Sequence, residues 1–485
     1  MRRSFRNIVW LGLGLIAALL AVVRLEGARS GVEINPVQIA ETPATIYRPA
    51  GEAPSDHLVV VSHGFAGSRQ MMEAISLTLA RSGLTVLAFD YVGHGRHPGR
   101  LSAEIERLDG TTEQLVAQTL DVIAAARDLE AHGKLSLLGH SMATDIVIRA
   151  GQRLGDVASI VAISMYSEAV TAEDPERLLI ISGAGEPRLR AVALEAVALV
   201  EAADEGVTVE NGAISRRAVA APYVEHVGVL WSATTLEEAS AWLAAGPAPV
   251  QTGPWLIALL GAILLMFHPL AQLLPERAKD TQPDVPSLKR AWAAALIPVP
   301  LVVAAAFVEV PLLGLAGFGG LTVALGVWGV SALLILQPFR PMRKTDLIAA
   351  CLLLVWGLGV FGLALDRYGA AFVPVGPRLP LLLMILPGAL AFALADRAMV
   401  QGRGVAGRVL LRGPFLASLL AAMVLVPTNL GLVFTVAPVL VLFHLVYGTM
   451  AGWAARRVGH MGPGLAAGVI LAWSIAASTP LFSAA

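Results

Sequence analysis

The sequence predicts two kinds of structure in one chain, a doubly wound α/β sheet and an all-α polytopic transmembrane domain. Three observations support this. The 485 residues are 56% hydrophobic and only 15% charged, which is unusual for a soluble protein. Acidic residues concentrate between 24 and 245, whereas basic residues outnumber them from 246 onward. Apolar runs are short before residue 245 and long after residue 254, typical of buried strands and of membrane-spanning helices respectively.

We therefore expect three parts. Residues 1–29 are predicted to form an N-terminal transmembrane anchor, residues 30–248 an extracytoplasmic α/β domain, and residues 249–485 a membrane domain of about eight helices. The chain is too long for a single ordinary core, which agrees with such a division. The single cysteine, Cys351, excludes an internal disulfide.

The α/β part is predicted from short, nearly continuous apolar runs, which suit parallel strands buried on both faces. These runs are 57–64, 84–91, 134–141, 159–166 and 177–185, with a last strand at 216–226. Residues 37–49 alternate like antiparallel strands. Amphipathic helices are expected at 69–82, 113–131 and 234–244. Doubly wound sheets place their sites at the carboxyl ends of the strands.

The membrane part is predicted from eight long apolar stretches, each near the ~20 residues that a spanning helix needs. They lie near 254–274, 291–310, 315–338, 347–365, 379–395, 410–427, 430–454 and 461–482. A further 17 uncharged residues separate Arg6 from Arg24. An uncleaved anchor is favoured over a signal peptide there, because the following "RLEGARSG" has no small-x-small cleavage site.

The basic residues predict an orientation. With a cytoplasmic N-terminus, 16 Lys or Arg residues fall on the cytoplasmic side, and the short outer loops hold only Arg367 and Arg378. By the positive-inside rule, the α/β domain then lies outside the cytoplasm, and we expect an integral protein of a bacterial inner membrane. His268, Glu309 and His444 stand isolated in or near the spans, which favours packing or interfacial roles over a proton path or metal site.

A candidate nucleophile lies in "GHSMA", residues 139–143. Ser141 follows a predicted strand and opens a predicted helix, with small residues two positions before and after it, as a strained strand-to-helix turn requires. Two further segments follow strand ends in this domain: "SHGF" at 62–65 and "FDYVGHG" at 89–95. An acid and a histidine, Glu186 and His226, come after the serine in chain order.

With these motifs, residues 35–245 resemble the α/β-hydrolase superfamily, nearest to its serine esterase and monoglyceride-lipase-like members. The resemblance implies that Ser141 is the nucleophile, His226 the general base and Glu186 the carboxylate that orients it. It also implies Phe65 and Met142 as oxyanion-hole donors. Ala143 departs from the usual glycine, and glutamate is less common than aspartate as the acid. Glu168, after the preceding strand, is the rival acid.

Other polar residues of this domain have simpler interpretations. His63 and His140 are expected to shape the loops that they belong to, and Asp145 to lie on a helix surface. His94 and His97 lack the Cys, Asp or Glu neighbours of a metal site, so we expect loop structure, no metal and no cofactor. The "SEAVTAEDPE" segment, 167–176, is too short for a cap domain. The sequence therefore predicts an open site, covered by the 97–112 loop or by the membrane part.

The sequence thus predicts a membrane-anchored serine hydrolase that cleaves carboxylic esters through an acyl-enzyme intermediate. Its expected partners are a small-molecule or lipid acyl-ester substrate and membrane lipids; protein partners are not predicted. No continuous basic surface points to nucleic acid. Two alternatives stay open: a transporter or scaffold with a hydrolase-like binding domain, and an acyltransferase that uses the same triad.

Overall fold

The computed structural model describes residues 2–51, 55–104, 107–129, 133–243, 249–276 and 285–484. They form two compact units. The first, the sheet unit, contains Leu20–Ala258 together with Arg367–Ala371, and the second, the helical unit, contains Met1–Leu19, Leu259–Asp366 and Phe372–Ala485. Arg277 and Lys279, two of the 16 basic residues that the sequence assigns to the cytoplasmic side, lie outside the described residues.

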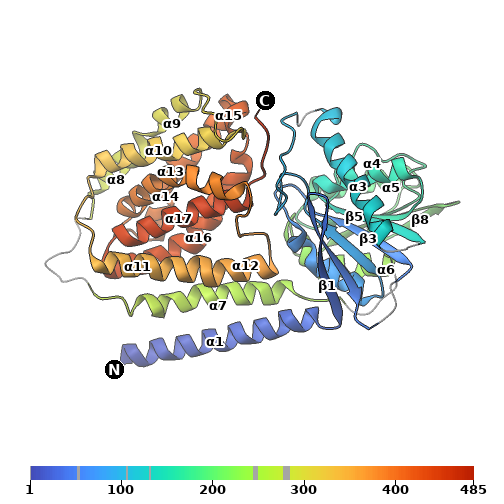
Figure 1. Cartoon of the computed structure of the whole chain (residues 1–485), viewed down its shortest axis with the longest axis horizontal. Helices are drawn as coiled ribbons and strands as arrows, with labels where there is room; N and C mark the ends of the chain where they lie inside the picture. The colour runs from blue at the N-terminus through green and yellow to red at the C-terminus, as the bar shows by residue number, and fades with distance from the viewer. Residues whose placement is uncertain are drawn as a thin grey trace. The chain divides into compact units, whose positions relative to one another are not determined.

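A nine-stranded sheet is the centre of the sheet unit, in the order β1-β2-β4-β3-β5-β6-β7-β9-β8 (Figure 1). The strands are β1 (Val32–Ile39), β2 (Thr42–Pro49), β3 (His57–Ser62), β4 (Thr85–Phe89), β5 (Lys134–His140), β6 (Val157–Ile163), β7 (Arg177–Gly183), β8 (Thr208–Asn211) and β9 (Ile214–Ala221). The six strands from β4 to β9 in this order pair in parallel. The outer strands β1, β2 and β8 pair antiparallel. The predicted doubly wound sheet is therefore confirmed.

Helices cover both faces of this sheet. They are α2 (Glu73–Arg81, after a 3-10 turn at Arg69–Met72), α3 (Glu113–Leu129), α4 (Met142–Leu154), α5 (Pro187–Ala198) and α6 (Ala233–Leu243). Val59 and Val61 of β3 belong to a buried cluster with residues of α2 and α6. Leu58 and Val60 point to the opposite face because side chains alternate along a strand, and they are equally buried.

Two details of the last hairpin differ from the sequence prediction. The final strand ends at Ala221 and not at residue 226, and Pro222, which has no N–H for a ladder hydrogen bond, directly follows it. His226 consequently lies on a loop. Strand β8 was not predicted, although the tight turn at Gly212, with φ of +62°, allows it to pair with β9.

The helical unit consists of long apolar helices. They are α7 (Gly253–Ala271), α8 (Leu288–Leu296), α9 (Val299–Ala305), α10 (Phe318–Leu336), α11 (Lys344–Leu354), α12 (Leu363–Tyr368), α13 (Arg378–Met399), α14 (Val405–Leu425), α15 (Pro427–Leu430), α16 (Val433–Val458) and α17 (Met461–Ser478). The N-terminal helix α1 spans Arg2–Arg29, and a π-helical segment, Val355–Gly362, joins α11 to α12.

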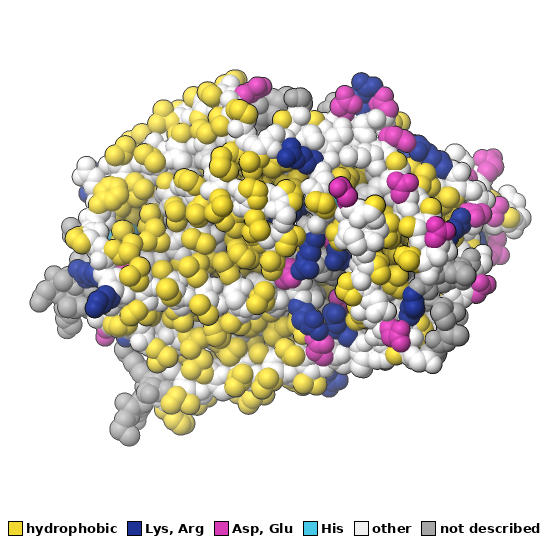
Figure 2. Space-filling view, in the orientation of Figure 1, with side chains coloured by type: hydrophobic (Ala, Val, Ile, Leu, Met, Phe, Trp, Pro, Cys, Tyr) yellow, Lys and Arg dark blue, Asp and Glu magenta, His cyan; other side chains and the backbone are white. Residues whose placement is uncertain are grey.

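Within the described residues, nine helices or joined helix pairs are long and apolar enough to cross a membrane. They overlap the nine stretches that the sequence predicts, so the all-α polytopic part of the fold is confirmed and the chain has the features of a membrane protein. Many of their large apolar side chains are exposed, among them Leu265 and Leu334. Figure 2 shows hydrophobic side chains over much of this unit's visible surface. Such exposure suits contact with lipid, where apolar surface carries no cost.

Candidate active site

Ser141 occupies a strained turn between β5 and α4. Its φ of 53° and ψ of −120° lie in a region that residues other than glycine rarely adopt. Strained backbone of this kind occurs most often at functional sites. Gly139 makes the turn feasible, because a Cβ there would lie 2.6 Å from the carbonyl oxygen of Ala143. Ala143, which stands where the motif usually has glycine, is fully buried in this turn.

The three side chains of the predicted triad lie within hydrogen-bonding distance of one another. His226 Nε2 is 2.8 Å from Ser141 Oγ, and His226 Nδ1 is 2.5 Å from Glu186 Oε1. Because the carboxylate only accepts, Nδ1 carries the proton and Nε2 accepts from the serine hydroxyl. The residues follow strands β5, β7 and β9, whose carboxyl ends meet at one edge of the sheet.

Glu186 is buried and well supported. The Ser164 hydroxyl donates to its Oε2 at 2.7 Å, and the backbone N–H of Gly183 donates to the same oxygen at 2.6 Å. Burial opposes the carboxylate charge, but the hydrogen bonds from His226, Ser164 and Gly183 outweigh it and hold the pKa of Glu186 below its usual value. Glu186 is therefore a carboxylate at neutral pH, as an orienting acid must be.

Sequence reasoning missed Ser164. It directly follows β6, at the same edge of the sheet as the other site residues, and it has a φ of 52°. Its position just past a strand end is the signal that would have found it. The rival acid Glu168 lies four residues further on and is exposed, whereas Glu186 makes the contact with His226.

His140 fixes the backbone of the His226 loop. Its Nε2–H donates to the carbonyl oxygen of His226 at 2.8 Å. Burial lowers the pKa of His140 to about 4, so the ring is neutral at physiological pH. The His226 loop also packs closely on Gly183, where a Cβ would lie 2.7 Å from the Val224 carbonyl oxygen. These two contacts bring the His226 loop close to Glu186.

The predicted oxyanion donors lie on two segments next to Ser141. Met142 is the first residue of α4, so its N–H has no acceptor within the helix. Phe65 follows Gly64, at which a Cβ would lie 3.0 Å from Ser141 Cβ; the backbone of this loop therefore packs directly on the serine. His63 stabilises the loop, since its Nδ1 donates to the Gly64 carbonyl at 2.8 Å and its Nε2 accepts from the Tyr91 N–H at 3.1 Å.

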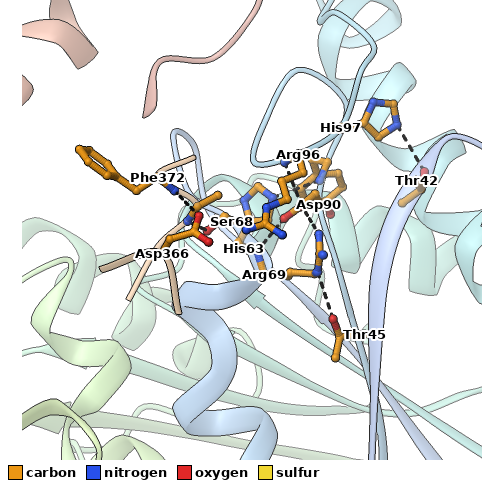
Figure 3. Close-up of polar contacts among 12 residues, drawn as sticks. Thr42, Thr45, His63, Ser68, Arg69, Asp90, Arg96, His97, Asp366 and Phe372 are labelled. Atoms are coloured by element: carbon orange, nitrogen blue, oxygen red, sulfur yellow. Dashed lines mark hydrogen bonds and ion pairs between the residues drawn. The ribbon is translucent and has the colours of Figure 1, made fainter. Parts of the chain in front are cut away.

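Asp90 joins the loop after β3 to the loop after β4 (Figure 3). The carboxylate is fully buried and accepts hydrogen bonds from the backbone N–H groups of Arg69, at 2.8 Å, and Arg96, at 3.0 Å. The Arg69 guanidinium completes a buried ion pair with it. This network gives the Phe65 loop a rigid base, which preorganised donors require.

The remaining polar candidates lie in structural contacts. The Gly99 N–H donates to His97 Nδ1 at 2.9 Å, and Asp145 accepts hydrogen bonds from Arg149 and Ser167, both at 2.7 Å. Over the part of the chain that the structure describes, no three His, Cys, Asp or Glu side chains are arranged to hold a metal ion.

The site is accessible. The connection from β6 to β7 is short, and the side chain of His226 is 42% exposed. Three large apolar side chains near the catalytic loops, Tyr166, Tyr223 and Val227, are also exposed. The prediction that the 97–112 loop covers the site falls partly on residues 105–106, which lie outside the described residues.

A protein-family model, described as serine aminopeptidase, S33, matches residues 53–180. No curated protein matches the sequence. Solved structures similar to the chain include a CIB-like hydrolase from Thermoplasma acidophilum (16% identity, covering 43% of this chain and 94% of its own, TM-score 0.33) and a dienelactone hydrolase from Anabaena variabilis (18%, 44%, 97% and 0.33). Another is an a/b serine hydrolase without lid from Xanthomonas campestris (16%, 45%, 98% and 0.33). The family match over residues 53–180, together with the parallel sheet and its strand-to-helix turn at Ser141, confirms the predicted resemblance: the N-terminal half of this chain resembles serine hydrolases and has the α/β-hydrolase fold.

Proposed function

We propose that the protein is a serine hydrolase that cleaves carboxylic esters through an acyl-enzyme intermediate. One observation carries this proposal: the continuous hydrogen-bonded chain from Glu186 through His226 to Ser141, beneath a strained serine backbone. A serine hydroxyl is a weak nucleophile until a base of fixed tautomer removes its proton. This chain supplies such a base.

The reaction proceeds in two halves. Ser141 Oγ attacks the acyl carbonyl carbon as its proton passes to His226 Nε2, and the negative oxygen of the tetrahedral intermediate accepts from the N–H groups of Phe65 and Met142. His226 then protonates the departing alkoxide, which leaves an acyl group on Ser141. In the second half, His226 deprotonates a water molecule that attacks this acyl carbonyl. The collapse of the second intermediate frees the acid and returns the proton to Ser141.

The surroundings of the serine favour an acylated, partly apolar substrate. Tyr166, Tyr223 and Val227 expose hydrocarbon close in sequence to Ser164 and His226, and the connection from β6 to β7, which contains Tyr166, is short. We place lipid esters and other acylated molecules of the membrane surface first among its substrates. Peptide amides, suggested by the description of the matching family model, are the competing class, and acyl transfer to an alcohol would use the same triad.

We also propose the division and orientation of the chain: an anchor at 1–29, an extracytoplasmic hydrolase domain at 30–248 and a membrane domain at 249–485 of a bacterial inner membrane. The asymmetry of basic residues supports this. In a Cys351→Ala background, an impermeant maleimide applied to intact cells or spheroplasts should label Ser55→Cys and spare Ser287→Cys. Labelling of Ser287→Cys alone would reverse the orientation.

A fluorophosphonate probe on isolated membranes tests the enzyme directly, because it reacts with activated serines whatever the natural substrate. Wild-type protein should be labelled, Ser141→Ala should not, and Ser55→Ala, which removes a serine outside the site, should label like wild type. Parallel assays with an acyl ester, an aminoacyl amide and an ester plus a competing alcohol separate the three reaction classes. Folded wild-type protein that takes no probe would favour the binding-domain alternative.

A further inference from the structure

Side chains of helices α10, α13, α14 and α16 line a cavity in the helical unit. Figure 1 shows these four helices. The volume of the cavity is about 410 Å³, within the range of small-molecule sites. Most of its wall is hydrocarbon, including Phe392, Phe415, Leu416 and Leu440. A ligand that fills this space must therefore present mainly apolar surface.

Charged side chains are set into the apolar wall. Asp396, Arg408 and Arg412 all line the cavity. The Arg412 guanidinium donates to both carboxylate oxygens of Asp396, at 2.7 and 2.8 Å, and Arg397 donates to the same carboxylate at 3.1 Å. The single carboxylate thus already has two arginine partners.

Arg408 leaves this cluster with an excess of positive charge. Within the described parts of the chain it forms no ion pair with a carboxylate, and its buried Nε has no hydrogen-bond acceptor. Arg397, Arg408 and Arg412 face one compensating charge, that of Asp396. Uncompensated charge among apolar helices is costly and marks functional sites in membrane proteins.

Two further polar groups on the cavity wall lack partners. Trp328 is 1% exposed, and its Nε1–H finds no acceptor among the described residues. His444 Nδ1, also buried, has no partner there either. Buried donors and acceptors are normally satisfied, so both groups point to a polar atom that a ligand would bring.

We propose that this cavity binds an amphiphile with an anionic head group and an alkyl chain. The acidic head group, a phosphate or a carboxylate, pairs with Arg408 and Arg412 on the cavity wall, and the chain lies along Phe392, Leu416 and Leu440. A free inorganic anion would leave the apolar wall uncovered, and an uncharged lipid would leave the arginine charge uncompensated. Acidic phospholipids and fatty acids share the required chemistry.

Native mass spectrometry of the full chain in neutral detergent tests this proposal. The Ser141→Ala variant is used throughout, so that ester probes survive and the result does not depend on the proposed hydrolase activity. Dioleoyl phosphatidic acid or oleate should form one saturable adduct per chain, at least roughly tenfold tighter than dioleoyl phosphatidylcholine, which has no net charge. Whichever of the two anionic probes binds more tightly identifies the source of the head group.

Matched variants locate the adduct. Arg408→Gln should weaken it by roughly tenfold or more, the scale of one charge-assisted hydrogen bond, while Lys289→Gln, which removes an exposed cation elsewhere, should not. Gly413→Phe should abolish the adduct by filling the cavity, and Gly261→Phe, at a helix position with equally open space outside the cavity wall, should retain it. Equal binding of phosphatidylcholine, binding of inorganic phosphate as tight as that of either amphiphile, or unchanged binding in both cavity variants would overturn the proposal.

Discussion

The two charged sites of this protein satisfy their polar groups differently. In the sheet unit, Glu186 has three hydrogen-bond donors, and each polar atom of the His226 ring has a partner. In the helical unit, the arginines around Asp396 outnumber their carboxylate, and Trp328 and His444 have buried polar atoms without partners among the described residues. A site that does chemistry with its own side chains must be complete before the substrate arrives, whereas a binding site leaves polar groups for its ligand to satisfy.

The difference also separates the tests of the two sites. Variants of the sheet unit should change catalytic rates and leave lipid binding intact, and variants around Arg408 should do the reverse. Serine variants that alter amphiphile binding, or cavity variants that stop labelling of Ser141, would show that the two sites are coupled.

The largest expected effect is that of Ser141→Ala. Ester turnover should fall by at least roughly 10⁴-fold, because the members of a triad act as a unit. The measurement is the steady-state rate with a short-chain acyl ester, with Ser55→Ala as a control for the loss of a hydroxyl. Residual activity close to wild type in Ser141→Ala would assign the reaction to another residue and end the contrast between a complete and an incomplete site.

Glu186→Gln should come next. An amide cannot stabilise the imidazolium of His226 as a carboxylate does, so kcat should fall by a factor on the order of 10²–10⁴. Glu168→Gln is the matched control, since its exposed side chain follows the neighbouring strand, and it should keep wild-type activity. A greater loss in Glu168→Gln than in Glu186→Gln would exchange their roles.

Local motifs and dispersed clusters differ in how far sequence alone reveals them. Ser141 and its small neighbours lie within five residues, and the order of Glu186 and His226 after the serine, near the last two strands, follows from the alternation of strands and helices. The supporting contacts of Ser164 and His140 required the register of β6 against β7 and the path of the loop after Pro222, which no local pattern specifies.

The residues around Asp396 in the helical unit were even harder to group from the sequence alone. His444 stands alone in the sequence, which favoured a packing role and no cluster in the spans. Helix packing brings it to the cavity that Asp396 and Arg412 also line, although the three residues come from different helices. Isolation in the sequence therefore does not imply isolation in the fold, because helix-to-helix contacts over tens of residues are not encoded in the apolar pattern of either helix. Arg397, Arg408 and Arg412, three of the 16 basic residues that the sequence assigns to the cytoplasmic side, lie within α13 and α14.

His140 should make the sheet unit sensitive to acid. Burial lowers its pKa to about 4, so between about pH 6.5 and 4 the unfolded chain binds a proton that the folded chain does not. Stability therefore falls as the pH drops through this window, by roughly 3 kcal/mol in total. The depressed pKa of Glu186 adds to the loss at the acidic end, below its unfolded value. Denaturation of the sheet unit at several pH values, followed through the fluorophosphonate-reactive fraction that survives, measures the slope.

His140→Gln isolates the histidine contribution. The glutamine amide can still donate to the His226 carbonyl oxygen, but it does not titrate. Between pH 6.5 and 4, the number of protons taken up on unfolding should therefore fall by about one, and stability should depend less on pH. An unchanged slope in this variant would show that other groups cause the acid sensitivity, and would weaken the view that the site's polar groups are fully satisfied.

The smallest effect is expected for Ser164→Ala, which tests whether the acid needs all of its donors. The hydroxyl donates to Glu186 Oε2, and the Gly183 N–H still binds that oxygen when the hydroxyl is removed. The carboxylate then becomes less firmly oriented and its pKa rises toward the ordinary value, which should lower kcat by about tenfold, the effect of one hydrogen bond to a charged group. KM should stay the same, because Ser164 supports the acid and does not contact the substrate. Ser164→Thr, which keeps the hydroxyl, should recover part of the rate. A change in KM alone would instead mean that Ser164 shapes the substrate pocket. The catalytic site would then consist of Glu186, His226 and Ser141 without a required contribution from Ser164.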